Sequence, residues 1–133
     1  MSQQNVEIVQ AAFLAYEQGD MDAVLQLCDE NIEITQDAKL LGAPGQQHGH
    51  AGVREAFALW PDLWDDFRVE VVRVDDFGAH VMVSTVNHGR GKGSGVPVEM
   101  PFTFLFMLRD GKITEWRLFM SEAQALEAAG RST

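Results

Sequence analysis

The sequence between residues 96 and 131 limits the possible fold more than any other stretch of this chain. It holds two apolar runs separated by Arg109-Asp110-Gly111-Lys112. An Asp-Gly pair between two such runs predicts a β-hairpin, because both central residues of the favoured turn need a positive φ. The run from Phe102 to Leu108 has no polar residue after Thr103, so we expect both faces of that strand to be covered. A short helix should follow the hairpin.

The length and charge of the chain narrow the class of protein. A chain of 133 residues is long enough for one domain with a real hydrophobic core. Ten basic and twenty acidic residues give a net charge of −10, which argues against nucleic acid or an anionic membrane as a partner. No apolar run approaches the roughly 20 residues that span a bilayer, and the first residues do not resemble a signal peptide. We therefore expect a cytoplasmic location.

The first half of the chain predicts three helices and one strand. The first helix has apolar residues at helical spacing, namely Val6, Val9, Phe13 and Tyr16. Gly19 is placed to end it and Asp20 to cap a second helix, which carries Val24, Leu27 and Cys28 inward. The lone Cys28 excludes an internal disulfide. Residues 32–36 alternate like a half-buried strand, 37–50 have no clear period and are predicted as a loop, and a third helix should end or kink near Pro61.

The second half predicts an antiparallel meander that ends in a helix. Strands are expected over residues 67–74 and 79–88, with a turn between them and a glycine-rich hairpin tip at 89–95. Ser121 and Gln124 are spaced as a capping box for the last helix, which should stop at Gly130. This order of elements predicts the α+β class, with a strongly curved sheet folded around helices.

Four short stretches of the chain are similar to a known family. They are residues 15–23 (AYEQGDMDA), 49–54 (GHAGVR), 111–117 (GKITEWR) and 125–130 (ALEAAG). Together they resemble the SnoaL-like proteins of the nuclear-transport-factor-two-like cone fold. The resemblance covers nearly the whole chain and implies a single domain over residues 1–133. In that fold a cone-shaped, strongly curved mixed/antiparallel sheet wraps around three N-terminal helices, a short helix closes the chain, and an apolar pocket lies at the open end.

Three chemistries known in that superfamily depend on carboxylates whose positions are filled differently in this chain. Resemblance to ketosteroid isomerase places the catalytic Asp at Gln36, and an amide cannot take the proton. Resemblance to limonene epoxide hydrolase places its two carboxylates at Asn87 and Leu118. Resemblance to the polyketide cyclases related to SnoaL places the acid/base Asp at Met120 or Ser121. The chain is therefore either a different enzyme on the same fold or a binder.

The candidate substrate-binding residues are mostly aromatic or apolar. If alternate residues of the last strand face inward, they form an adaptable apolar wall, while two tryptophans close the mouth and the first helix adds two rings. The predicted set is Phe13, Tyr16, Trp60, Trp64, Trp116, Leu118 and Met120. Each of these residues has the alternative interpretation of an ordinary core residue.

The candidate polar residues are Gln36, Asn87 and His50. With Thr85 and Asn87 facing the pocket, His88 must point to the other face of the sheet. His50 suits acid/base work near neutral pH, although a His in such a loop more often donates to a carbonyl. His48 and His50 also suggest a metal, but the sequence offers no third and fourth ligand. We therefore predict neither a metal nor a cofactor.

Two functions remain open after this reasoning. In the first, the chain is an isomerase-, cyclase- or hydrolase-type enzyme that acts on a small apolar carbonyl or epoxide metabolite. His50 would move the proton, while Gln36 and Asn87 would hold the substrate oxygen. In the alternative, the chain is a non-catalytic binder of a small hydrophobic ligand. In both cases we expect a homodimer through the outer sheet face, because an exposed meander face needs cover.

Overall fold

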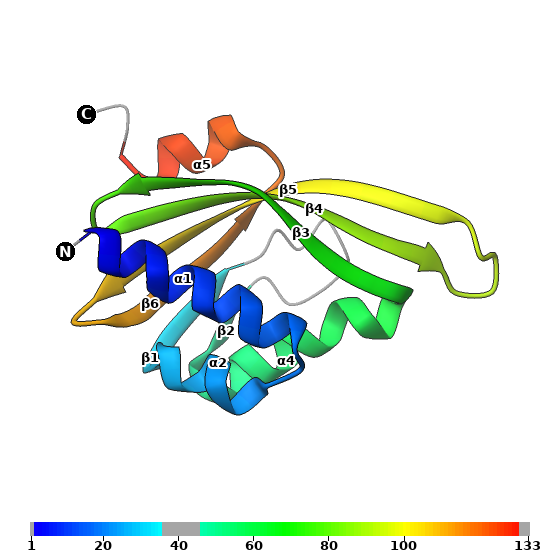
Figure 1. The fold of residues 1–133 in the computed structure, drawn as a ribbon, viewed down its shortest axis with the longest axis horizontal. Helices are drawn as coiled ribbons and strands as arrows, with labels where there is room; N and C mark the ends of the chain where they lie inside the picture. The colour runs from blue at the N-terminus through cyan, green and yellow to red at the C-terminus, as the bar shows by residue number, and fades with distance from the viewer. Residues whose placement is uncertain (1, 36–45, 131–133) are drawn as a thin grey trace.

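The computed structural model describes residues 2–35 and 46–130, in which four helices accompany one mixed six-stranded sheet (Figure 1). The helices are α1 (Ser2–Glu17), α2 (Met21–Leu27), α4 (Gly49–Leu63) and α5 (Glu122–Ala128). The strands are β1 (Cys28–Thr35), β2 (Gln46–His48), β3 (Trp64–Phe77), β4 (His80–Gly91), β5 (Pro97–Arg109) and β6 (Lys112–Phe119). The predicted α+β class is confirmed.

The strand order in the sheet is β2-β1-β6-β5-β4-β3. Only the β1–β6 pair is parallel, and the other neighbours are antiparallel. Figure 1 shows α1, α2 and α4 on one side of the sheet and α5 on the other. We call the side that faces α1, α2 and α4 the inner face and the side that carries α5 the outer face. Among the described residues, no helix is both long and apolar enough to cross a membrane.

The β5–β6 hairpin forms as the sequence predicts. Arg109 pairs with Lys112, and the two turn residues Asp110 and Gly111 have φ of 53° and 78°. Both faces of β5 are covered between Phe102 and Leu108. Its inner face contributes phenylalanines to the main core, and its outer face places Leu105 in a smaller cluster with Met82 and Ala125 of α5.

The predicted helix caps are also present. Gly19 has a φ of 74°, and Asp20 accepts a hydrogen bond from the Ala23 backbone N–H at 3.1 Å, so one helix ends where the next begins. At the other end of the chain, the Ser121 hydroxyl accepts from the Gln124 backbone N–H at 3.2 Å. These caps satisfy backbone donors that the first turn of each helix leaves without partners.

Several predicted boundaries are wrong. Cys28 starts β1 rather than extending the second helix, and Gln46–His48, predicted as loop, form β2 against β1. Three residues are too few to show a period, so no sequence pattern marks such an edge strand. Helix α4 ends at Leu63, two residues after Pro61, near which the sequence predicts an end or a kink. Strand β3 is longer than the predicted 67–74.

Candidate functional site

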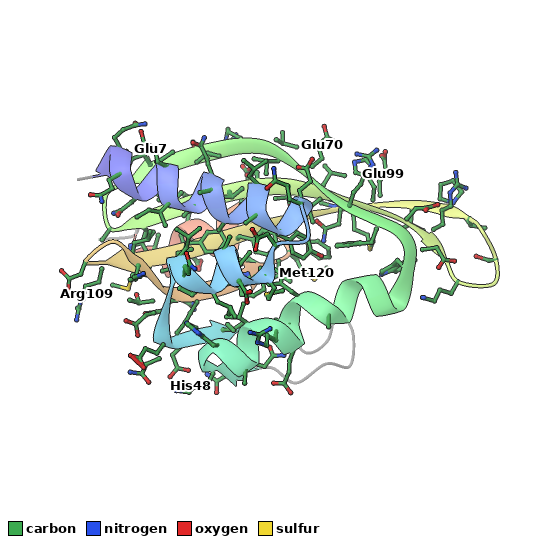
Figure 2. The ribbon with its side chains drawn as sticks, turned by 60° about the horizontal axis from the view of Figure 1, so that its bottom comes forward. Glu7, His48, Glu70, Glu99, Arg109 and Met120 are labelled. Carbon is green, nitrogen blue, oxygen red and sulfur yellow. The ribbon has the colours of Figure 1, made fainter. Side chains whose placement is uncertain are left out.

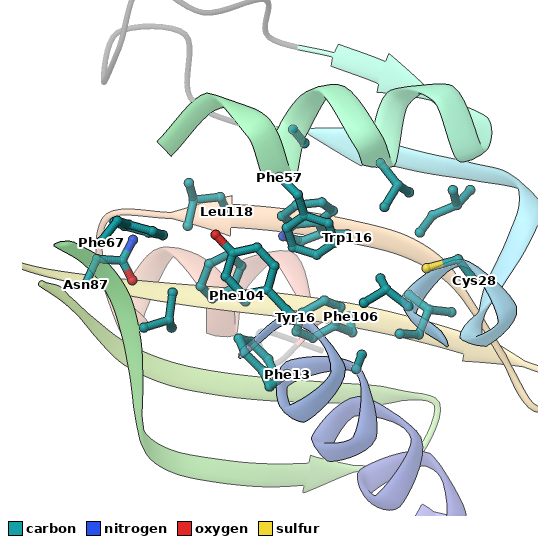
Figure 3. A pocket seen from close by; sticks show the side chains of 17 residues that line it. Phe13, Tyr16, Cys28, Phe57, Phe67, Asn87, Phe104, Phe106, Trp116 and Leu118 are labelled. Carbon is teal, nitrogen blue, oxygen red and sulfur yellow. The ribbon is translucent and has the colours of Figure 1, made fainter. Parts of the chain in front are cut away.

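An apolar cavity lies between the inner face of the sheet and helices α1, α2 and α4 (Figure 3). It offers about 50 Å³ to the centres of water molecules. At roughly 10–15 Å³ for each water, that space holds a few waters. A larger molecule therefore enters only when side chains at the wall move aside.

Aromatic rings form most of the cavity wall. Phe57 of α4 stacks between Tyr16 of α1 and Trp116 of β6, with centroid distances of 4.6 and 4.8 Å. Phe13 of α1 meets Phe104 and Phe106 of β5 edge-on, at 5.7 and 5.8 Å. Each such pair adds about 0.5–1.5 kcal/mol beyond its buried area. The rings therefore join α1, α4 and the sheet into one wall.

Asn87 is the polar exception in this apolar wall. It lies on the inner face of β4, between Val69 of β3 and Met100 of β5, and only 1% of its surface is exposed. Its Oδ1 atom is buried and has no hydrogen-bond partner among the residues that the structure describes. A buried polar atom without a partner costs about 1–3 kcal/mol. The cavity therefore contains an acceptor that the fold leaves without a donor.

Two tryptophans also carry buried indole nitrogens without a partner, Trp64 and Trp116. Trp116 lines the cavity, whereas Trp64 does not, although it packs against the same core. The cavity wall therefore presents an unpaired acceptor on Asn87 and an unpaired donor on Trp116, beside the hydroxyl of Tyr16. In Figure 3 the Tyr16 hydroxyl points toward the end of the cavity where Asn87 lies.

The cavity carries no ionised group at neutral pH on its described walls. Tyr16 and Cys28 are the ionisable residues among those that line it. Burial raises the pKa of Tyr16 to about 12. Burial also raises the pKa of Cys28 to about 11, although the positive charge of Lys112 opposes this shift. Both groups stay protonated at neutral pH, so Cys28 is not a ready nucleophile.

A wider groove lies outside the cavity, between α1 and β3. It offers about 660 Å³ and shares Phe13, Tyr16, Phe67 and Val69 with the cavity wall. Its remaining lining includes polar side chains, among them Glu17 and Arg68. The four shared side chains therefore separate the cavity from a more open and more polar surface.

The structure brings five of the predicted residues together. Phe13, Tyr16, Asn87, Trp116 and Leu118 all line the cavity. Met120, labelled in Figure 2, does not, because β6 ends at Phe119 and 55% of the Met120 surface is exposed. Gln36 and the side chain of Trp60 lie outside the part of the chain that the structure describes.

The predicted proton carrier His50 does not line the cavity. It stands in the first turn of α4, and its Nε2 lies 3.1 Å from the backbone carbonyl oxygen of Cys28. His48 contacts Glu33 at the surface, and His88 points to the outer face, as the strand alternation predicts. Among the described residues, no histidine lines the cavity, and no group of His, Cys, Asp and Glu is arranged to hold a metal ion.

Sequence reasoning left Phe57, Phe104 and Phe106 out of the pocket. A signal for two of them was present, because Phe104 and Phe106 are two residues apart and must share one strand face. Phe106 is also the cross-strand partner of Trp116 in the β5–β6 hairpin. Counting back from the Asp-Gly turn would have paired Trp116 with Leu105, because a bulge between Met107 and Leu108 shifts the register by one residue.

The comparison with known families now gives the class of protein. The model of the SnoaL-like domain matches residues 9–116. The chain therefore belongs to the SnoaL-like domain family. No curated protein matches the chain.

Solved structures share the fold over almost the whole chain. The protein TerC, crystallised with polyporic acid, is 21% identical, with a TM-score of 0.77 over 93% of this chain and 96% of its own. A candidate SnoaL-like polyketide cyclase from Jannaschia sp. CCS1 is 23% identical, with a TM-score of 0.77 over 96% and 92%. A Catenulispora acidiphila protein of ketosteroid isomerase-like fold, in complex with trimethylamine, is 22% identical, with a TM-score of 0.73 over 93% and 92%.

Proposed function

We propose that this chain binds a small, uncharged and largely apolar molecule in the cavity between the sheet and its three inner helices. The observation that carries this proposal is the character of the described wall, which is aromatic and aliphatic apart from a few uncharged polar groups. Ligand pockets commonly combine an apolar wall with a few polar groups that fix orientation. Relatives of the same fold crystallised with small molecules support the same interpretation.

The arrangement of helices and sheet explains how such a ligand would be held. The ligand enters from the groove between α1 and β3, where the side chains of Phe13, Tyr16 and Phe67 separate groove from cavity. Its apolar surface then replaces water against the rings of the wall, which favours binding by about 25 cal/mol for each Å² buried. The cavity grows as the rings move aside.

Two neighbouring alanines of α1 provide the test. Ala12 is buried and lines the cavity, whereas Ala11 is exposed. Native mass spectrometry of protein purified from its own host should find a small apolar molecule on the wild type. Ala12→Leu, which fills the cavity, should lose that molecule, and the matched control Ala11→Leu should keep it. A molecule that stays equally on Ala12→Leu is bound elsewhere, and the proposal then fails.

Catalysis on the bound molecule is the second candidate function. It is favoured by relatives described as candidate polyketide cyclases. The substrate would be a carbonyl or epoxide compound, with His50 moving a proton while Gln36 and Asn87 hold the oxygen. His50 can act only after its ring leaves the Cys28 carbonyl. Turnover that is unchanged in His50→Ala removes His50 from this mechanism.

We also propose a homodimer formed through the outer face of the sheet. Helix α5 covers the outer face only around Met82 and Leu105, and Pro101 stays exposed beside the half-buried Val86. The wild type should sediment at about twice the 14.8 kDa of one chain. Val86→Glu should sediment as a monomer, while Leu14→Glu, on an exposed position of α1, should remain dimeric. A wild type near 14.8 kDa contradicts the dimer.

A further inference from the structure

We propose that the cavity selects an uncharged ligand that carries a hydroxyl group, and that this hydroxyl donates a hydrogen bond to Asn87. This inference rests on the proposed function and narrows it to one class of ligand. It also assigns Asn87 a binding role that differs from that of a catalytic acid or base.

The position of Asn87 shows why a ligand donor is needed. Its neighbours across the two adjacent strands, Val69 and Met100, offer no side-chain donor, and its Oδ1 is buried without a partner. Leucine has the same number of side-chain heavy atoms, branched at the same carbon, and carries no polar atom. Buried polar atoms of native proteins almost always have partners, and those that have none call for an explanation. A ligand that completes the hydrogen bond supplies one.

The kind of unpaired atom decides between ligand groups. A carbonyl, an ether or an epoxide only accepts hydrogen bonds, so it cannot pair with Oδ1. A hydroxyl donates to Oδ1 and keeps its lone pairs for a second partner. The unpaired Nε1 of Trp116, in the wall of the same cavity, is a donor that a ligand oxygen can satisfy. A neutral hydroxyl compound therefore fits the free atoms better than a pure acceptor does.

The same atoms discriminate against charged ligands. A carboxylate has no proton to donate and would bring its negative charge toward an acceptor oxygen. Among the described lining residues, no Lys, Arg or His is present to balance that charge. Burying an unpaired charge in an apolar site is strongly unfavourable. We therefore expect the cavity to reject the anion of an otherwise similar molecule.

Four compounds of one shape form the probe set. They are p-xylene, which has no polar group, p-cresol, which has a hydroxyl, 4-methylbenzaldehyde, which only accepts, and 4-methylbenzoate, which is an anion. Isothermal titration calorimetry gives the dissociation constant of each. In the wild type we expect p-cresol to bind tightest and 4-methylbenzoate to show no measurable binding.

The decisive quantity is the ratio of the p-xylene to the p-cresol dissociation constant. Asn87→Leu should lower this ratio by about tenfold, since it removes one buried hydrogen bond and leaves the apolar wall in place. Asn87→Ser, whose hydroxyl still accepts, should keep part of the ratio. The control His88→Gln changes the next residue of β4, which faces the outer side, and should leave the ratio unchanged. Retained binding of p-xylene shows that each variant is folded.

The outcomes separate this inference from the function on which it rests. A ratio that stays the same in Asn87→Leu overturns the role of Asn87, while the cavity remains a binding site. Binding of 4-methylbenzaldehyde as tight as that of p-cresol overturns the hydroxyl class, and binding of 4-methylbenzoate overturns the selection for neutral ligands. If the wild type binds none of the four compounds, the proposed function itself fails.

Discussion

The two faces of strand β4 differ in how their polar side chains are paired, although Thr85 on the inner face donates to the Phe102 carbonyl at 3.3 Å. On the inner face, Asn87 is buried among apolar residues with an unpaired Oδ1. On the outer face, its neighbour His88 contacts Glu70 at 2.8 Å and Glu99 at 3.4 Å, and both glutamates are labelled in Figure 2. Ser84, also on the outer face, donates to Glu122 at 2.7 Å. One strand therefore carries paired polar groups outside and an unpaired polar group inside.

This difference distinguishes polar side chains that stabilise the fold from a polar side chain that is available to bind a ligand. The contacts on the outer face tie β3, β4, β5 and α5 together, and the side chains of Arg73, Ser84 and His88 there each have a partner within the chain. The inner face leaves its amide oxygen unpaired although apolar side chains of similar size are available. An unpaired buried group that the fold does not need is a better guide to a binding site than a paired one at the surface.

The largest expected effect comes from removing a ring of the inner face. Trp116→Ala should lower the free energy of unfolding by about 3–5 kcal/mol, because a buried indole is lost and a cavity is left behind. Phe119→Ala, on the outer face of the same strand and only half-buried, should cost clearly less. Urea unfolding followed by circular dichroism measures both. An equal or larger cost for Phe119→Ala would contradict our assignment of the main core to the inner face.

The second largest effect is expected at high pH, where ionisation of a buried group on the inner face should lower the free energy of unfolding. Cys28 has a pKa of about 11 in the folded chain against an ordinary thiol pKa of 9.0, so the unfolded chain loses its thiol proton first. The stability that the buried neutral thiol contributes is present below pH 9 and is lost as the pH rises toward 11. Urea unfolding between pH 8 and pH 11 should show a loss of about 2 kcal/mol that Cys28→Ala does not share.

An independent spectroscopic measurement accompanies this test. Tyr16 is the one tyrosine of the sequence, so near-ultraviolet absorbance of tyrosinate reports on it alone. Its midpoint should lie near 12 in the folded chain and near 10.0 after unfolding in urea. A folded midpoint near 10.0 would place Tyr16 in solvent and would contradict its position in the cavity wall.

Substitutions at Asn87 and His88, two neighbouring residues of β4, should change the free energy of unfolding by smaller amounts and in opposite directions. Asn87→Leu should raise the free energy of unfolding by about 1 kcal/mol, because it replaces an unpaired buried amide with an apolar side chain. His88→Leu should lower it, since it leaves Glu70 and Glu99 without their shared partner. Urea unfolding of the two variants compares the faces directly. If Asn87→Leu destabilises the protein, Asn87 already has its partner in the ligand-free chain.

The sequence predicts the fold well because the strongest signals are local. The Asp110-Gly111 turn, the cap at Asp20 and the cap at Ser121 each depend on a few neighbouring residues, and all three form as expected. The strand alternation that turns Asn87 inward and His88 outward is equally local. The errors arise where distant contacts decide, as in β2, which exists only because β1 pairs with it.

The cavity is less predictable for the same reason. Its wall combines α1, α4, β5 and β6, and the stack of Tyr16, Phe57 and Trp116 joins residues 100 positions apart. No spacing rule connects such residues before the fold is known. The alternation of inward-facing residues along β6 predicts Met120 in the cavity wall. This prediction fails because the strand ends one residue earlier, at Phe119. That Asn87 lacks a partner also becomes visible only when every neighbour is in place.

The smallest expected effect concerns the outer face and appears at low pH. The Ser84 hydroxyl donates to the Glu122 carboxylate, and Arg73 pairs with that carboxylate at 2.9 Å. Together they lower the pKa of Glu122 below its ordinary value of 4.5. A carboxyl with a lowered pKa stabilises the fold above its unfolded pKa and loses that contribution as the pH falls through its folded pKa.

Ser84→Ala should therefore move the urea midpoint slightly downward at pH 7, and this difference should shrink at pH 3. Glu122→Gln removes the titration while keeping an acceptor for Ser84, so in that variant the effect of Ser84→Ala should no longer depend on pH. If the difference in midpoint stays constant down to pH 3, the hydroxyl acts by packing rather than by holding the carboxylate. If the difference shrinks at pH 3 as expected, the outer face weakens in acid and the inner face in alkali, each where its own polar groups change charge.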